Sequence, residues 1–227
     1  MLNEICSLMD YRPRFTPNWL IRWFLFYIIL FSVFSILSLK SEVSAEPRQD
    51  LSVYKHGQGL NPIDPESELK RLNRLIESGE KNADVYYNRG WVYENKNDLE
   101  KAERDYTMAI EISNKHIDAY YNRGLVYFKL KRYKKAANDF SETIKLEPKS
   151  VDAYCNRGNS YFMLGKTDLA IKDYNIALEL DANDPDLYYN RAIIYLAIGE
   201  RIKASDDFEQ AASLGHNLAK RYLGHGG

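Results

Sequence analysis

Four asparagines are the first candidates for binding chemistry in this 227-residue chain, because each belongs to one copy of the tetrapeptide Tyr-X-Asn-Arg. They recur every 34 residues, at Asn88, Asn122, Asn156 and Asn190. A side-chain amide offers a donor and an acceptor together, so a row of amides suits the backbone of an extended peptide. The competing interpretation is that each amide bonds within its own turn or with the next repeat, as short amides often do.

An arginine follows each asparagine, and an aspartate recurs with the same period later in each copy. A planar guanidinium suits two-bond pairing with a carboxylate, so we expect structural pairs between helices. A row of arginines that binds an anionic ligand is the rival interpretation. The expected pairs are Arg89 with Asp105, Arg123 with Asp139, Arg157 with Asp173, and Arg191 with Asp207.

Aromatic side chains next to the asparagines are further candidates for contact with a partner, since exposed aromatics often anchor interfaces. They are Tyr87, Tyr121, Tyr189 and Trp91. Packing between neighbouring helices is an equally good explanation for them. An aspartate near the start of each copy either complements a helix dipole or makes an acidic rim that favours basic partners. These aspartates are Asp84, Asp118, Asp152 and Asp186.

Nothing in the sequence indicates an enzyme, a cofactor or a metal site. Catalysis needs a clustered nucleophile, base or metal set, and none is visible. The two cysteines, Cys6 and Cys155, and the four scattered histidines lack metal-ligand spacing. The formal net charge of −1 argues against a nucleic-acid binder, which normally carries a basic excess on one face.

The elements that must position these residues are pairs of helices. With positions counted from Ala83, Ile117, Val151 and Pro185, large aromatics recur at positions 4, 11 and 24 and small residues at 8 and 20. Positions 4, 8 and 11 share one face of a first helix, and positions 20, 24 and 27 share one face of a second. Small residues let the two backbones approach, and aromatics fill the space beside them. One such hairpin cannot bury its apolar face, so at least three must stack.

This pattern resembles the tetratricopeptide repeat family from Ala83 to about Leu214. The resemblance implies an all-α, right-handed α-solenoid of antiparallel helix pairs, whose concave groove takes up peptides or partner helices. The family usually has Trp at position 4, Leu at 7 and Pro at 32, whereas this chain has Tyr at 4, Arg at 7 and a single Pro148 at 32. One subclass grips a chaperone's C-terminal carboxylate with Lys and Arg at positions 2 and 6 of its third unit. This chain has Asp and Asn there, which argues against that function.

Helices that cap the solenoid are expected on both sides of the repeats. The apolar residues of 68–78 fall on one helix face, and residues 217–223 form a short closing helix. The expected organisation is a signal peptide or anchor at 1–45, a linker at 46–66, a capping helix at 67–82, repeats at 83–116, 117–150, 151–184 and 185–216, and a capping helix with a tail at 217–227.

The apolar run 23–39 is preceded by arginines, which sets the N-terminus on the cytoplasmic side. It is long for a signal peptide and short for a transmembrane anchor, and Val43-Ser44-Ala45 fits a cleavage site before Glu46. Either interpretation puts the repeats outside the cytoplasm, in a periplasmic or secreted protein or a membrane-anchored one. We therefore expect an extracytoplasmic adaptor for a protein or peptide. The alternatives are a self-associating component of a membrane complex and a saccharide or cell-wall binder.

Overall fold

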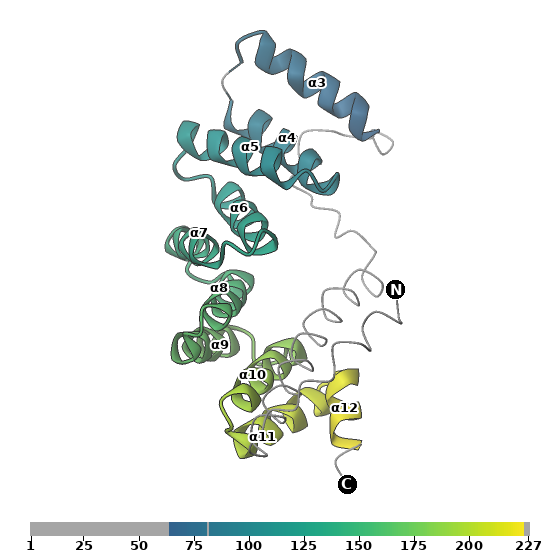
Figure 1. The fold of residues 1–227 in the computed structure, drawn as a ribbon, viewed down its shortest axis with the longest axis vertical. Helices are drawn as coiled ribbons and strands as arrows, with labels where there is room; N and C mark the ends of the chain where they lie inside the picture. Colours follow the sequence, from purple (N-terminus) through teal and green to yellow (C-terminus); the bar gives the residue numbers. More distant parts are fainter. Residues whose placement is uncertain (1–63, 81, 225–227) are drawn as a thin grey trace, which may run out of the picture. The chain divides into compact units, whose positions relative to one another are not determined.

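Stacked pairs of α-helices form the part of the chain that the computed structural model describes, residues 64–80 and 82–224 (Figure 1). The predicted all-α solenoid is confirmed, and every regular element in these ranges is a helix. The helices are α3 (Pro65–Glu77), α4 (Ala83–Asn95), α5 (Leu99–Ile112), α6 (Ile117–Lys129), α7 (Tyr133–Leu146), α8 (Val151–Met163), α9 (Thr167–Leu180), α10 (Pro185–Ala197), α11 (Arg201–Ser213) and α12 (Asn217–Gly224).

The first helices α4, α6, α8 and α10 begin at the residues from which the repeats were counted. Helix α3 begins at Pro65, inside the range expected for the linker, because two local features start it there. The Asp64 side chain accepts a hydrogen bond from the Ser67 N–H at 3.1 Å, and Pro65 occupies the first helical position, where no N–H is needed.

The turn between the two helices of each repeat contains one residue in the left-handed region. These residues are again 34 apart: Asn97 (φ 59°), Lys131 (φ 58°), Gly165 (φ 72°) and Gly199 (φ 84°). Glycine adopts this conformation freely, which explains its presence in the third and fourth repeats. The recurrence shows that all four turns follow the same path.

The core of each repeat lies where its two helices cross. The alanines at position 20 and the aromatics at position 24 are all 0% exposed: Ala102, Ala136, Ala170, Ala204, Tyr106, Phe140, Tyr174 and Phe208. A Cβ placed on Gly124 would lie 2.8 Å from the Phe140 ring. The same approach occurs at Gly90 and Gly158, at 3.0 and 3.2 Å. The small residue is therefore required by the large one facing it.

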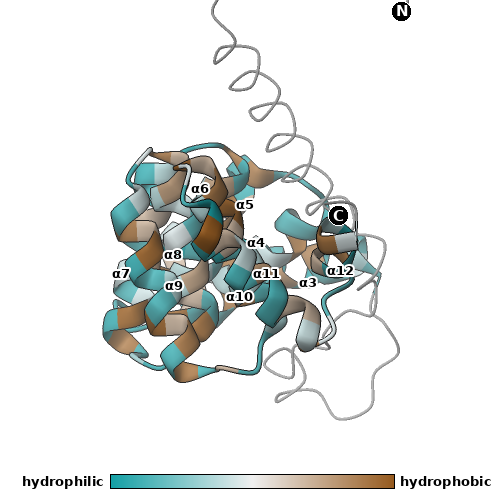
Figure 2. Ribbon diagram, turned by 90° about the horizontal axis from the view of Figure 1, so that it is seen from below, coloured by the Kyte–Doolittle hydropathy of each residue, from teal (hydrophilic) through white to brown (hydrophobic). Residues whose placement is uncertain are grey.

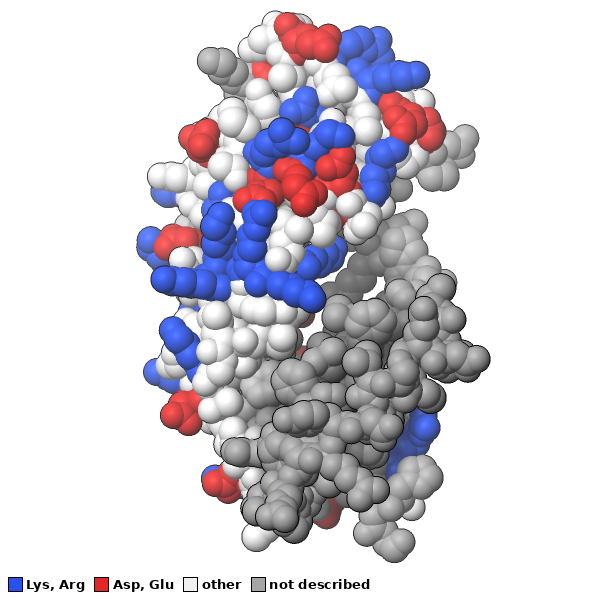
Figure 3. Space-filling model, in the orientation of Figure 1, with Lys and Arg blue, Asp and Glu red and all other residues white. Residues whose placement is uncertain are grey.

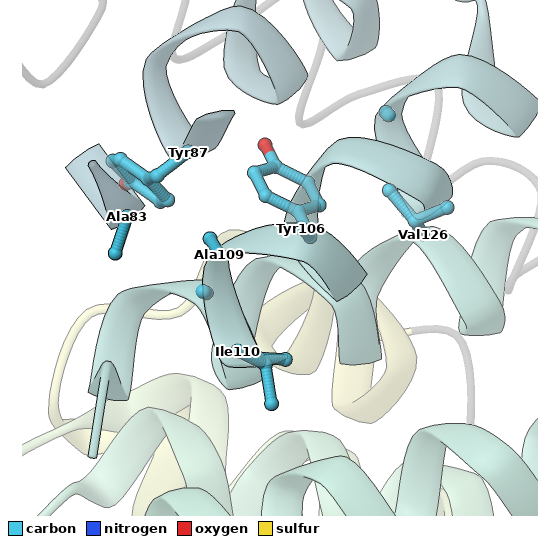
Figure 4. Packing of buried hydrophobic residues seen from close by; sticks show 8 residues of the cluster. Ala83, Tyr87, Tyr106, Ala109, Ile110 and Val126 are labelled. Carbon is cyan, nitrogen blue, oxygen red and sulfur yellow. The ribbon is translucent and has the colours of Figure 1, made fainter. Parts of the chain in front are cut away.

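Neighbouring repeats pack on one another along the array. Each second helix packs on the first helix of the next repeat, and α6 also meets the first helices on either side of it, α4 and α8. Figure 4 shows this for the first two repeats, where Tyr106 and Ala109 of α5 pack near Val126 of α6. Each helix carries both apolar and polar residues (Figure 2), as expected where one face packs and another meets water.

The end helices cover the two ends of the stack, which would otherwise be exposed to water. Helix α3 buries Leu69 and Leu72 against Val85 and Val92 of α4. Helix α12 packs on α11, and its Tyr222 ring lies 4.2 Å from that of Phe208.

The predicted signal peptide or anchor, including the apolar run 23–39, lies outside the described residues, as does the linker up to residue 63. Among residues 64–80 and 82–224, no helix is both long enough and apolar enough to span a membrane.

Candidate functional site

Each arginine of the Tyr-X-Asn-Arg sequences forms two hydrogen bonds with the aspartate of its own second helix. Arg123 on α6 donates from Nε and Nη2 to the two carboxylate oxygens of Asp139 on α7, at 2.7 and 2.8 Å. Arg89–Asp105, Arg157–Asp173 and Arg191–Asp207 repeat the arrangement at 2.7–2.8 Å. The four carboxylates are buried, at 2–5% exposure. Such paired bonds fix both helices of a hairpin in one orientation.

The third nitrogen of each arginine reaches back to the preceding helix. Arg123 Nη1 donates to the Thr107 hydroxyl on α5 at 3.1 Å, and Arg157 Nη1 donates to the Ser141 hydroxyl on α7 at 3.2 Å. Arg89 and Arg191 reach the side-chain oxygens of Asn73 and Asn175 in the same way. Each arginine thus joins three helices and links one repeat to the element before it.

These four acceptors were not predicted from the sequence, although they recur with the period of the repeats. Asn73, Thr107, Ser141 and Asn175 are short polar residues at intervals of 34. Their chemistry varies, so no single residue type marks the position.

Tyrosines at positions 4 and 11 hold the guanidinium between them. The Arg157 guanidinium carbon lies 5.4 Å from the centre of the Tyr154 ring and 5.8 Å from that of Tyr161. The other three arginines lie 5.6–6.0 Å from the equivalent rings. Each guanidinium lies beside two tyrosine rings, and its three nitrogens all donate hydrogen bonds within the protein. The arginine row therefore has the geometry of a structural joint between helices rather than of an anion-binding site.

The charges in these joints affect each other's protonation. The hydrogen bonds that Arg89 donates to Asp105 raise the pKa of Arg89, and those that Arg157 donates to Asp173 raise the pKa of Arg157. Burial raises the pKa of Asp139, and the bonds from Arg123 oppose that effect. Asp139 therefore depends on Arg123 to stay ionised inside the core.

The asparagine row runs along neighbouring first helices. Asn122 Nδ2 donates to the Tyr87 hydroxyl of the preceding repeat at 3.0 Å, and Asn156 Nδ2 donates to the Tyr121 hydroxyl at 3.0 Å. Asn156 also donates to the Asp152 carbonyl at 2.9 Å. These bonds use the amide nitrogens alone. The Asn122 side chain also forms a hydrogen bond with that of Tyr106. Within the described residues, the amide oxygen of Asn156 accepts no hydrogen bond, and the half-buried side chains of Asn88 and Asn190 form none.

The four aromatic candidates divide into two groups. Tyr87 and Tyr189 are buried, at 4% and 8% exposure, and leave little ring surface for a partner. Trp91 and Tyr121 are half-buried, so part of each side chain remains exposed. Trp91 packs against the cluster formed by α3 and α4.

Two histidines cover the buried tyrosines. The His116 and His216 rings lie 4.9 and 4.1 Å from those of Tyr87 and Tyr189. Each Nδ1 accepts a backbone N–H three residues ahead, at 3.3 and 3.1 Å, and each Nε2 lies 3.3 Å from an aspartate at position 2, Asp84 or Asp186. His116 therefore closes the junction between the first and second repeats, and His216 the junction between the fourth repeat and α12.

The aspartates at position 2 remain at the surface, and the side chains of Asp84 and Asp186 are 73% and 52% exposed. They give the first-helix face an acidic edge next to the asparagines. Across residues 64–80 and 82–224, no group of three or more acidic, His or Cys side chains could hold a metal ion.

Models of the tetratricopeptide repeat match residues 83–116, 117–150, 140–172 and 185–214, and a further TPR repeat model matches residues 158–199. Together these matches show that the repeats are tetratricopeptide repeats. No curated protein sequence matches the chain.

Solved structures resemble the chain in fold. A crystal structure of MamA is 20% identical with a TM-score of 0.65, and the match covers 69% of this chain and 92% of that one. MamA 41-end from Desulfovibrio magneticus RS-1 is 21% identical with a TM-score of 0.64, covering 66% and 85%. The first TPR of Spaghetti (RPAP3), solved bound to the HSP90 peptide SRMEEVD, is 28% identical with a TM-score of 0.50, covering 52% and 93%.

Proposed function

We propose that this chain, whose residues 83–214 belong to the tetratricopeptide repeat family, binds an extended segment of another protein along the face formed by its first helices. Proteins of this family generally act as adaptors that do not catalyse reactions. The proposal assigns the chain the same role of interaction scaffold.

The observation that carries the proposal is the asparagine row. Asn122 and Asn156 are held in place through their amide nitrogens, by hydroxyls of the preceding repeat. Their amide oxygens therefore have a fixed orientation and can accept hydrogen bonds from backbone N–H groups of a peptide. Because these amides are already ordered, a ligand loses little side-chain entropy when it binds them.

The acidic edge adds a preference for charge. The exposed carboxylates of Asp84 and Asp186 stand at the same end of their helices, and each repeat adds one aspartate at this position. We propose that the bound segment carries Lys or Arg beside its backbone. Complementary charge of this kind favours association and the choice of partner more than raw affinity.

The Spaghetti structure supports a peptide as ligand, because that repeat stack was solved with one bound. The aspartates at position 2 would repel a carboxylate, so an acidic C-terminal peptide is not the ligand that we propose here. An internal, basic segment fits this chain better.

The experiment is to select peptides from a random library with the full-length protein and to titrate the tightest one by fluorescence anisotropy. The double change Asn122→Ala, Asn156→Ala should weaken binding about 30-fold, since each lost hydrogen bond contributes about 1 kcal/mol. Asn138→Ala is the matched control, because Asn138 is an exposed asparagine on the second helix α7. Thermal unfolding of each variant separates loss of binding from loss of structure. Equal binding by all three proteins would refute the assignment of the ligand to the first-helix face.

We further propose that the repeats lie outside the cytoplasm, on the basis of the apolar run 23–39 and the arginines before it. Mass spectrometry of the mature protein tests this proposal. A chain that starts at Glu46 would be a released protein, and a chain that retains residues 1–45 and resists extraction from membranes would be an anchored one. A soluble protein with an intact N-terminus would contradict both.

A further inference from the structure

We propose that one edge of the solenoid, made by the turns within the second, third and fourth repeats, docks on a membrane surface that contains anionic lipid. We call it the turn edge, and define it as residues 129–135, 163–169 and 197–203. These segments occupy the same point of successive repeats. Since the repeats stack in one order, equivalent turns follow one another along one edge of the array.

The first segment of the turn edge is strongly basic. Five of its seven residues are Lys or Arg, and none is acidic. Lys129 is paired with Glu94 and Arg132 with Glu103, at 2.6 and 2.5 Å. Among the described residues, no acidic group lies within ion-pair distance of Lys131 or Lys134. Figure 3 shows Lys and Arg side chains gathered over α6 and α7, with uncharged surface below them at the level of α8.

The next two segments expose large apolar side chains where the first has cations. Their exposed fractions are 41% for Met163, 37% for Leu164, 42% for Leu169, 42% for Ile198 and 80% for Ile202. An isolated exposed apolar residue needs no explanation, but here five lie at two successive turns. The turn edge therefore combines a basic segment with protruding apolar side chains, which is the combination that binds interfaces of anionic bilayers.

The opposite edge, made by the turns between repeats, has a different charge. Exposed apolar residues occur there too, as at Leu180, but the turns at 112–118, 146–152 and 180–186 together carry six acidic residues and two lysines. An anionic surface would attract the turn edge and repel this one. The charge difference between the edges orients the array, with its first-helix face left open to a protein ligand.

A lipid surface fits the turn edge better than an acidic peptide does. Peptides are held in grooves, along sheet edges or by ordered polar groups. The turn edge offers flexible lysines and side chains that project outward, which suit a fluid layer of headgroups. Each cation close to such a surface strengthens binding about fivefold.

The test places a polarity-sensitive dye on the turn edge of the full-length protein. Cys6→Ser and Cys155→Ser provide the background, and the dye is attached through Ala197→Cys. Ala182→Cys is the matched control, since Ala182 is an exposed alanine in the opposite turn. Because the dye reports its own surroundings, the readout is independent of whether residues 1–45 hold the protein on the vesicle.

Vesicles of phosphatidylcholine, with or without phosphatidylserine, are then added. With phosphatidylserine, the dye at position 197 should shift to the blue and be quenched by a lipid-borne quencher, whereas the dye at 182 should not respond. Lys131→Glu with Lys134→Glu should weaken this response at least 30-fold, and Lys145→Glu with Lys149→Glu, which changes the net charge equally, should leave it intact.

Three results would overturn the proposal: no response to phosphatidylserine at position 197, an equal response at position 182, or equal effects of the two charge reversals. A response to soluble polyglutamate in place of vesicles would assign the edge to an acidic protein instead and would also reject it.

Discussion

Removing Arg123 should destabilise the protein far more than an exposed arginine would, because its partner Asp139 is only 5% exposed. Arg123→Ala leaves that carboxylate in the core without its two hydrogen bonds and also removes the bond that the Thr107 hydroxyl accepts. Breaking a buried pair from one side costs about 3–5 kcal/mol. Asp139→Ala should cost less, since the Arg123 side chain is 14% exposed and can turn towards water. The double variant should be more stable than the sum of the single effects predicts, by about 2 kcal/mol.

Urea unfolding measures these free energies, followed by circular dichroism and by tryptophan fluorescence. The two signals must coincide for a single free energy to apply, because repeat arrays can unfold in parts. Lys145 and Glu142 on the same helix form a matched control pair at 3.1 Å, with side chains 72% and 44% exposed. That pair should show a coupling energy below about 0.5 kcal/mol. Additive effects of Arg123→Ala and Asp139→Ala would refute the structural role of the joint.

Three further outcomes follow from the described geometry. Gly124→Ala should lower the free energy of unfolding by about 1–2 kcal/mol, because its Cβ would lie 2.8 Å from the Phe140 ring; calorimetry of the variant checks this. Gly165→Ala should cost about 1 kcal/mol through its backbone alone, since φ is 72° and no atom lies within 4 Å of the new Cβ; the same calorimetry applies. Because the pKa of Asp139 is raised in the folded state, its protonation favours folding below the unfolded pKa, and this contribution is lost as pH rises through the folded pKa. Removing Arg123 raises that pKa further, so the loss of unfolding free energy in Arg123→Ala, relative to the wild type, should be smaller at about pH 5 than at about pH 7. Urea midpoints at both pH values test this, and an equal loss at both would contradict it.

The sequence predicted the helix pairs and their packing because these depend on residue size at fixed spacing. An alanine at position 20 and an aromatic at position 24 leave few ways to cross two helices, and Phe140 and Ala136 are both fully buried as that pattern requires. The same period also identified the arginines and aspartates that the structure joins. Binding of a partner by the asparagines remains a prediction.

Contacts between repeats were harder to foresee. The residues that accept the third hydrogen bond of each arginine are all polar but not all of one type. Thr107 and Ser141 therefore did not stand out in the sequence. The burial of Tyr87 and Tyr189 depends on His116 and His216, which lie at different positions of their repeats and do not belong to the periodic pattern. Periodicity identifies the contacts that every repeat makes, and it cannot identify the contacts that are particular to one junction.

The backward bond of each arginine gives every junction of the array one hydrogen bond of the same kind. If residues 117–150 were deleted, Arg157 would meet the Thr107 hydroxyl in place of the Ser141 hydroxyl, and both accept the same hydrogen bond. Insertion of a second copy of the same residues would create one more junction of the same kind. The length of this protein is therefore adjustable in whole repeats, because gene duplication or loss would lengthen or shorten its first-helix face while each remaining arginine keeps a backward acceptor.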